Sequence, residues 1–326
     1  MQVPEDPIRQ ACKTWGYTPR EAQFLWLVTA FGGHFIREQY NRFIGVGTGT
    51  PDQVLCRKLL STGHAAAAFV WGRRHRTDRY HVCGRALYRV FGRENSTNRK
   101  APKSNSAIAV RVAMLDLVLA EPDVEFLLSD QDRLGYLRDV HGITDPSLVP
   151  TRVYPARGPL GTTPATNVLF PDRFPMGIAK DKTPAFSFVD APDDGLQPFE
   201  THVARYAPLL LALKTRARFV FVSGVETKIA RAQVAFRRAF EAPPQEITAL
   251  LLRYFTLEDR IRRKDFTGLL KRDYVERAEL ANRFTGARYE SLFERWRSGG
   301  HPGEGATPLH VEAPEFSTLR APSLDH

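Results

Sequence analysis

Two carboxylates in the middle of the sequence are spaced so that they could hold a metal ion. Asp172 follows Pro171 just before a short predicted strand, and Asp190 comes at the end of the predicted strand 185–191. A pair of carboxylates can bind Mg²⁺, which prefers oxygen ligands, and the metal can activate water for phosphodiester hydrolysis. Glu200, on the following helix, could line the same cleft. These three acidic residues are the candidate catalytic set.

The candidate set lacks the lysine that such hydrolysis needs beside the attacking water. An acidic residue, a spacer and a lysine are expected at the end of the strand, but the sequence reads Asp190-Ala191-Pro192. Lys180 and Lys182 are near in the sequence but in the wrong register. Ordinary turn and strand-end carboxylates are therefore the favoured interpretation. We expect no cofactor, with Mg²⁺ needed only by a nuclease.

A second candidate site is the segment 71–93, WGRRHRTDRYHVCGRALYRVFGR, which has seven arginines and one acidic residue. Guanidinium groups stay charged at any working pH and match phosphate oxygens in geometry. The whole net charge of +10 comes from residues 1–103, which hold 17 Lys and Arg against 7 Asp and Glu, whereas residues 104–326 hold 29 of each. Such asymmetry points to nucleic acid or an acidic membrane surface.

Capping residues and apolar periodicity predict the elements around these arginines. The sequence TPRE at 18–21 is a capping box that starts a helix, and a second helix is expected over 34–44. A second box, TPDQ at 50–53, starts a third helix. Segments 64–71 and 80–91 are strand-compatible and flank a basic tip. The expected core face of the third helix consists of Val54, Leu55, Leu59 and Leu60.

Three helices followed by a hairpin with a basic tip are typical of a winged helix-turn-helix, in which the third helix enters the major groove and the hairpin contacts phosphates. We therefore expect a DNA-binding domain over 14–93. The residues predicted to face the groove are Gln53, Arg57 and Lys58. Those predicted to contact DNA from the wing and its flank are Arg73, Arg74, His75, Arg76, Arg79 and Arg85. The aromatic residues expected to serve the core or strand pairing are Trp71, Tyr80 and Tyr88.

The remaining sequence predicts further parts of a multidomain protein of the α/β (α+β) class. A polar linker at 94–106 precedes an α/β domain at 107–224, with strands expected at 167–170, 174–178, 185–191 and 218–224. Amphipathic helices are expected over 225–297, as a packing or oligomerisation element. Residues 298–326 are rich in Gly, Pro and Ser and are predicted to be disordered.

Two resemblances add to this interpretation. The αβββαβ order and the Pro171-Asp172 pair resemble the PD-(D/E)xK nucleases, which implies a restriction-endonuclease-like middle domain. The stretches TPRE…LWLV…FGGHFIREQY, PDRFP…PAFSFVDA and RFVFVSG resemble plasmid replication-relaxation proteins and related accessory proteins of mobile elements, over about 20–225. The second resemblance implies DNA binding in the replication, transfer or transcriptional control of a mobile element.

Composition sets the expected location and partners. Three well-separated cysteines and the absence of an apolar run of roughly 18–20 residues predict a cytoplasmic protein with no membrane span. We expect double-stranded DNA as the partner, bound by a homodimer, because many winged helices bind two half-sites. Two alternatives stay open: a metal-dependent nuclease using Asp172 and Asp190, and a protein–protein adaptor whose basic wing binds an acidic partner.

Overall fold

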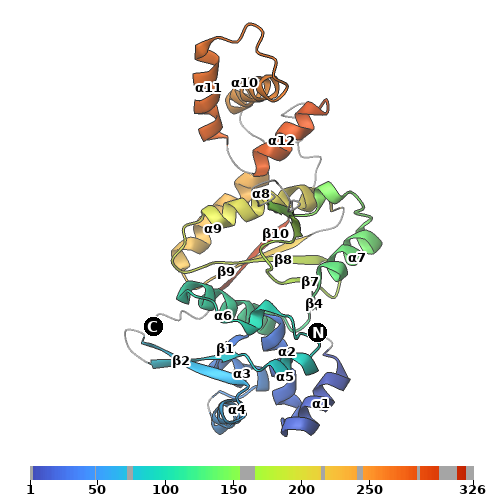
Figure 1. The fold of residues 1–326 in the computed structure, drawn as a ribbon, viewed down its shortest axis with the longest axis vertical. Helices are drawn as coiled ribbons and strands as arrows, with labels where there is room; N and C mark the ends of the chain where they lie inside the picture. Colours follow the sequence, from blue (N-terminus) through green and yellow to red (C-terminus); the bar gives the residue numbers. More distant parts are fainter. Residues whose placement is uncertain are drawn as a thin grey trace, which may run out of the picture.

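The computed structural model describes residues 3–47, 49–71, 76–154, 166–213, 217–240, 245–284, 287–300 and 314–320. The protein is of the mixed α/β class and has three parts, stacked along its long axis (Figure 1). These are an N-terminal unit, a central sheet with helices on both faces, and a set of C-terminal helices. Within the described ranges, no helix is both long and apolar enough to cross a membrane.

The N-terminal unit runs in the order helix, strand, helix, helix and hairpin. After α1 (Glu5–Trp15) come α2 (Pro19–Ala30), β1 (His34–Ile36), α3 (Arg37–Ile44), α4 (Thr50–Ser61), β2 (Ala65–Trp71) and β3 (Arg76–Val82). The three strands form an antiparallel sheet of order β1-β3-β2, with His34 opposite His81 and Ala65 opposite Val82. The predicted capping box of α2 is confirmed: Glu21 N donates to Thr18 Oγ1 at 3.2 Å, and Thr18 N donates to Glu21 Oε2 at 2.7 Å.

Three local predictions in this unit are wrong. Residues 34–36 form β1 instead of a helical turn, because they pair with β3. The second hairpin strand ends at Val82, and α5 (Arg85–Val90) follows Gly84, where an added Cβ would lie 2.9 Å from the His64 Cα. Thr50 does not cap α4, because it is already the first helical residue; Gln53 N instead donates to Asp52 Oδ1 at 2.8 Å.

The segment 94–106 is packed on the N-terminal unit, so the prediction of a linker is wrong there. It contains η1 (Thr97–Arg99), in which the Asn98 amide donates to Thr29 O at 3.2 Å and to Ala30 O at 3.1 Å. The Asn98 carbonyl lies 3.1 Å from His81 Nε2. This anchoring fixes where the following helix, α6 (Asn105–Ala120), leaves the unit.

Helix α6 lies between the N-terminal unit and the central sheet (Figure 1). Its Leu115 and Val118 belong to the N-terminal core, whereas Ala113 and Leu117 pack on the sheet. A helix with apolar residues on all sides is normally buried on all sides, and α6 is covered by the N-terminal unit on one side and by the sheet on the other. The buried Asp116 accepts a hydrogen bond from an Arg42 guanidinium nitrogen at 2.8 Å, which ties α6 to α3.

The central sheet has five strands in the order β10-β9-β8-β7-β4. They are β4 (Glu125–Leu127), β7 (Met176–Ile178), β8 (Pro184–Val189), β9 (Arg218–Ser223) and β10 (Glu315–Arg320). Strand β7 is antiparallel to both neighbours, while β8, β9 and β10 are parallel. One face carries Phe219 and Phe221 towards α8 (Gln197–Ala212) and α9 (Glu226–Phe240), and the other carries Val220 and Val222 towards α6. Cover on both faces explains the continuous apolar strands.

Two predictions about this part need correction. Residues 315–320, expected within a disordered tail, form β10, and the Phe316 ring centroid lies 4.8 Å from that of Phe236. The strand expected at 167–170 is β6 (Thr166–Leu169), which pairs with β5 (Thr151–Tyr154) in a separate two-stranded sheet. The first strand of the central sheet is instead β4, and α7 (Asp130–His141) follows it.

The C-terminal helices form a small unit with its own core. They are α10 (Gln245–Arg262), α11 (Lys271–Arg283) and α12 (Ala287–Arg297). Their core contains Leu251, Phe255, Leu280, Phe284 and Phe293. Buried Glu258 accepts hydrogen bonds from Arg262 and Arg277, both at 2.8 Å, which joins α10 to α11.

Candidate nucleic-acid interface

Helix α4 presents an exposed face whose side chains could read DNA. Thr50, Gln53, Val54 and Arg57 share this face at helical spacing and are exposed. The buried stripe runs through Asp52, Leu55, Cys56 and Leu59. Of the four residues predicted to form the core face, Leu55 and Leu59 are buried, which confirms them. Val54 and Leu60 are 43% and 44% exposed, so their prediction as core residues is wrong. Spacings of three and four residues define each face of the helix.

Two ion pairs set the orientation of α4. The Arg37 Nε donates to the buried Asp52 carboxylate at 2.7 Å, which joins α3 to the start of α4. The Lys58 ammonium donates to Glu21 Oε2 at 2.7 Å and to Gly16 O at 3.0 Å, which joins α4 to α2. Lys58 therefore holds the helix in place, and the structure does not bring its ammonium together with Gln53 and Arg57.

Gln53 and Arg57 are the two predicted groove residues that remain available. Both are exposed, and neither side chain forms a hydrogen bond with any residue in the described ranges. A glutamine side chain can bond both edge atoms of adenine, an arginine can bond both acceptors of guanine, and an apolar group can contact the thymine methyl. With Val54 beside them, the exposed face offers all three kinds of contact.

The wing residues divide into three groups. Arg73, Arg74 and His75 lie outside the described residues, as does the side chain of Arg76. Arg79 is only 4% exposed on β3, so the prediction that it holds a phosphate is wrong. The period-two alternation of β3 places Arg79 on the same side of the strand as His81, in the interior of the N-terminal unit, and the sequence alone could not reveal this burial.

The arginine predicted to contact DNA just beyond the hairpin already has an internal partner. Arg85 Nε donates to Glu94 at 2.8 Å, and Arg89 Nε donates to the same carboxylate at 3.1 Å. These hydrogen bonds, first from Arg89 and then from Arg85, lower the pKa of Glu94 to about 2.

Tyr80 and Tyr88 are buried, which confirms them as core residues.

The candidate catalytic carboxylate Asp172 lies against α8, where two side chains hold it. It accepts hydrogen bonds from His202 Nδ1 at 2.6 Å and from an Arg205 guanidinium nitrogen at 2.7 Å. Burial acts to raise the pKa of Asp172, but these two partners lower it overall. Burial also lowers the pKa of His202. Glu200 is exposed on the same helix and makes no side-chain hydrogen bond with the described residues.

The second carboxylate, Asp190, is closed in at the end of β8. Its side chain is 3% exposed and accepts from Ser223 Oγ at 2.8 Å and from Lys228 Nζ at 2.9 Å. Burial raises the pKa of Asp190, and the two hydrogen bonds only partly oppose this. Lys228 also donates to the carbonyl oxygens of Ala191 and Pro192. The ammonium group therefore closes the turn after β8.

Lys228 is the residue that the sequence interpretation missed. The strand motif lacks a lysine, yet α9 brings one to Asp190 from 38 residues further along the chain. The only local signal was a lysine in the first turn of the helix that follows β9. Within the described ranges, no group of three or more His, Cys, Asp or Glu is placed to hold a metal ion.

Compared with known proteins, the chain matches no family model, no curated protein and no solved structure. We therefore base the function on the geometry of the described residues.

Proposed function

We propose that the protein binds double-stranded DNA with α4 in the major groove. The observation that carries this proposal is the exposed face of α4, on which Gln53 and Arg57 have no hydrogen-bond partner among the described residues. The order of elements and the β1-β3-β2 sheet agree with a winged helix, in which the corresponding helix reads base edges.

Rigid support of α4 favours readout over loose electrostatic attraction. The Arg37–Asp52 and Lys58–Glu21 pairs, both at 2.7 Å, fix the helix on two sides. Side chains projecting from a fixed helix lose little further freedom on binding. The wing arginines Arg73, Arg74 and Arg76 are proposed to add phosphate contacts, each of which increases the salt dependence of binding.

Fluorescence anisotropy of a labelled duplex, measured over a range of salt concentrations, tests the proposal. Affinity for a duplex of random sequence measures the phosphate contacts of the wing. The additional affinity for a duplex selected from a random library measures base recognition by α4. The Arg73→Ala/Arg74→Ala/Arg76→Ala variant should weaken binding to both duplexes and flatten the salt slope. The Gln53→Ala/Arg57→Ala variant should lose preference for the selected sequence. Lys271→Ala removes an exposed cation from α11 and is the matched control.

Absence of duplex binding by the wild type at low salt would overturn the proposal and favour the adaptor, with an acidic protein on the wing. A role in replication, transfer or transcriptional control of a mobile element stays a prediction from the resemblance. Homodimerisation also stays a prediction. Sedimentation with and without a two-half-site duplex measures it directly.

A metal-dependent nuclease is the second candidate function. When α7 and the separate β5–β6 pair are left out, the order α6, β4, β7, β8, α8, β9 agrees with an αβββαβ outline. Lys228 supplies an ammonium group beside Asp190. The internal partners of Asp172 and Asp190 argue against it, because metal binding would have to displace them. Incubation of plasmid DNA with Mg²⁺ or Mn²⁺ distinguishes the two functions. Cleavage that is lost in Asp172→Ala would establish the nuclease, and no cleavage would leave DNA binding alone.

A further inference from the structure

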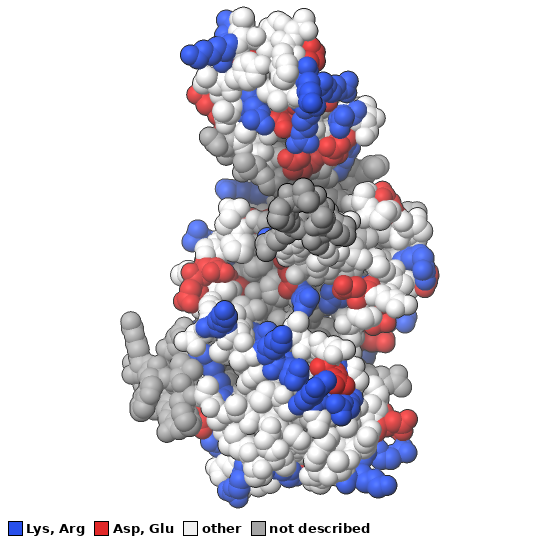
Figure 2. All heavy atoms as spheres, viewed as in Figure 1, with Lys and Arg blue, Asp and Glu red and all other residues white. Residues whose placement is uncertain are grey.

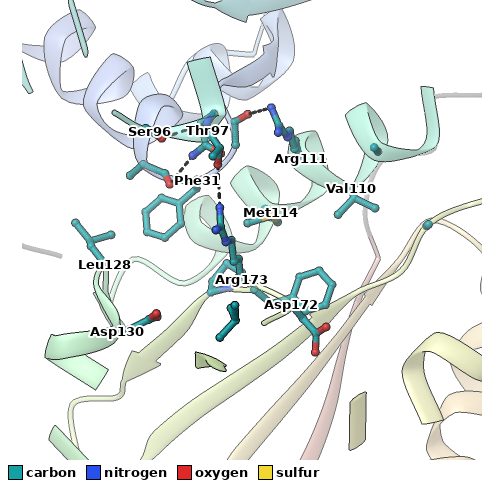
Figure 3. Close-up of a pocket in the computed structure, with 18 of the residues that line it drawn as sticks. Phe31, Ser96, Thr97, Val110, Arg111, Met114, Leu128, Asp130, Asp172 and Arg173 are labelled. Carbon is teal, nitrogen blue, oxygen red and sulfur yellow. Dashed lines mark hydrogen bonds between the residues drawn. The ribbon is translucent and has the colours of Figure 1, made fainter. Parts of the chain in front are cut away.

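A pocket of about 860 Å³ lies where the N-terminal unit meets the central sheet. Figure 3 shows Phe31 and Thr97 on one side, α6 with Arg111 and Met114 on a second, and Leu128 and Arg173 towards the sheet. Strands β4 and β8 point in the same direction, because each is antiparallel to β7, which lies between them. Residues that follow these two strands also line the pocket. Ligands of α/β sheets bind at the carboxyl ends of parallel strands, and pockets of roughly 300–1,000 Å³ take small molecules.

Three guanidinium groups line this pocket, and their hydrogen bonds go to uncharged oxygens. Arg111 donates to Lys100 O at 2.9 Å, Arg133 donates to Phe174 O at 3.1 Å, and Arg173 donates to Thr97 Oγ1 at 3.0 Å. Figure 2 shows Lys and Arg side chains gathered along the same junction on the face drawn. Among the described residues, none of these three guanidinium groups is hydrogen-bonded to a carboxylate, so the pocket carries positive charge.

The acidic residues of the pocket do not cancel this charge. The charge of Asp172 is neutralised by Arg205, while His202 only donates a hydrogen bond to it, and Asp130 forms a longer ion pair with Arg133 at 3.8 Å. Because Arg205 offsets the charge of Asp172, the lining keeps three guanidinium groups against the two carboxylates of Asp130 and Asp194. An anion in the pocket therefore meets more positive charge than negative charge.

Two buried polar atoms of the lining lack partners. Arg133, 7% exposed, has a buried Nε with no hydrogen-bond partner among the described residues, and the Ser106 Oγ is likewise buried and unpartnered. Buried polar atoms are nearly always hydrogen-bonded in native proteins, to protein, water or ligand. Both atoms belong to pocket-lining residues, but each is shielded from the open space of the pocket, so it is the guanidinium groups lining the pocket that indicate a ligand.

We propose that the pocket binds a nucleoside phosphate, either a free nucleotide or the terminal nucleotide of a DNA strand. Arg173 and the hydroxyl of Thr97 bind the phosphate, since guanidinium and hydroxyl donors suit its oxygens. The apolar side chains of Phe31, Met114 and Leu128 form the wall for the base. The ligand thereby contacts both the N-terminal unit and the sheet.

Isothermal titration of the full chain with each of the four 2′-deoxynucleoside 5′-monophosphates tests the proposal. Arg173 has a φ of +56°, a conformation that glycine adopts without strain, so Arg173→Gly removes the side chain without straining the backbone. We expect this variant to bind nucleotides at least about tenfold more weakly, the loss of one charge-assisted hydrogen bond. Arg138→Ala is the matched control, because Arg138 is exposed and pairs with Asp139.

Deoxyadenosine, inorganic phosphate and a short 5′-phosphorylated single strand complete the set of ligands. Tighter binding of the strand than of the mononucleotides identifies a DNA end as the source, and the reverse order identifies a free nucleotide; both support the proposal. Three results overturn it: no binding of any nucleotide at millimolar concentration, equal binding by Arg173→Gly, or equal binding of deoxyadenosine or phosphate alone. No duplex is present, so failure here is distinct from failure of groove binding by α4.

Discussion

Replacing Lys228 by methionine tests whether the end of β8 depends on one internal cation. The side chains of Asp190 and Lys228 are 3% and 12% exposed, and they meet at 2.9 Å. Methionine keeps most of the length of lysine but removes its charge, leaving Ser223 Oγ as the side-chain donor to the carboxylate. Breaking a buried pair from one side costs about 3–5 kcal/mol of unfolding free energy. We expect a loss of this size at pH 8.

The loss should shrink in acid. Burial already raises the pKa of Asp190 above its ordinary 3.8, and removal of the cation raises it further. A carboxyl group with a higher pKa in the folded state binds its proton more tightly there than when unfolded. Protonation therefore stabilises the folded variant as pH falls through that raised pKa, and the gap to wild type narrows between pH 8 and pH 5.

Urea unfolding followed by tryptophan fluorescence at the two pH values measures both effects. The Asp190→Asn/Lys228→Met double variant removes both charges of this buried pair. It should therefore regain part of the stability lost at pH 8. Lys271→Met is the surface control. A loss below about 1 kcal/mol at pH 8, or an equal loss at both pH values, would refute the assignment of a buried, uncompensated carboxylate.

Three further predictions concern other parts of the chain. Arg57→Ala should weaken binding of a selected duplex by about tenfold without changing the melting temperature, since one exposed guanidinium is lost; anisotropy and calorimetry check this. Burial lowers the pKa of His34 from 6.5 to about 4, so the unfolded state protonates first and stability should fall, by up to about 3 kcal/mol, as pH drops between these values. His34→Gln should flatten that dependence in urea unfolding; an unchanged curve would exclude His34 as its source. Phe316→Ala should lower the free energy of unfolding by about 2 kcal/mol through loss of contact with Phe219 and Phe236, and an unchanged urea midpoint would count against β10 as a structural strand.

Features fixed by neighbouring residues could be predicted from the sequence. The Thr18–Glu21 box forms within one helical turn, and it appears as expected. A hairpin was also predicted and is found, but its second strand, β3, shares only 80–82 with the predicted strand and includes residues expected at the basic tip. In the capping box the deciding contacts are close in the chain, so residue type and spacing were enough.

Features decided by contacts between distant segments could not be predicted. Whether Arg79 is exposed depends on how the N-terminal unit packs around β3, and whether Lys58 is available depends on Glu21, 37 residues away. Strand β10 looks like a polar tail until β9 supplies its hydrogen-bond partner. The predicted site therefore kept Gln53 and Arg57, whereas Lys58 and Arg79 serve the interior.

The position of β10 in the chain has a consequence for biosynthesis. The helices α10 to α12 are synthesised after β9 and before β10, so they interrupt the central sheet in the order of translation. While the ribosome makes them, β9 is an open edge whose backbone groups β10 will later pair. Open edges invite pairing with other chains. The C-terminal helices have a core of their own, so we expect them to form during this interval, before β10 pairs with β9.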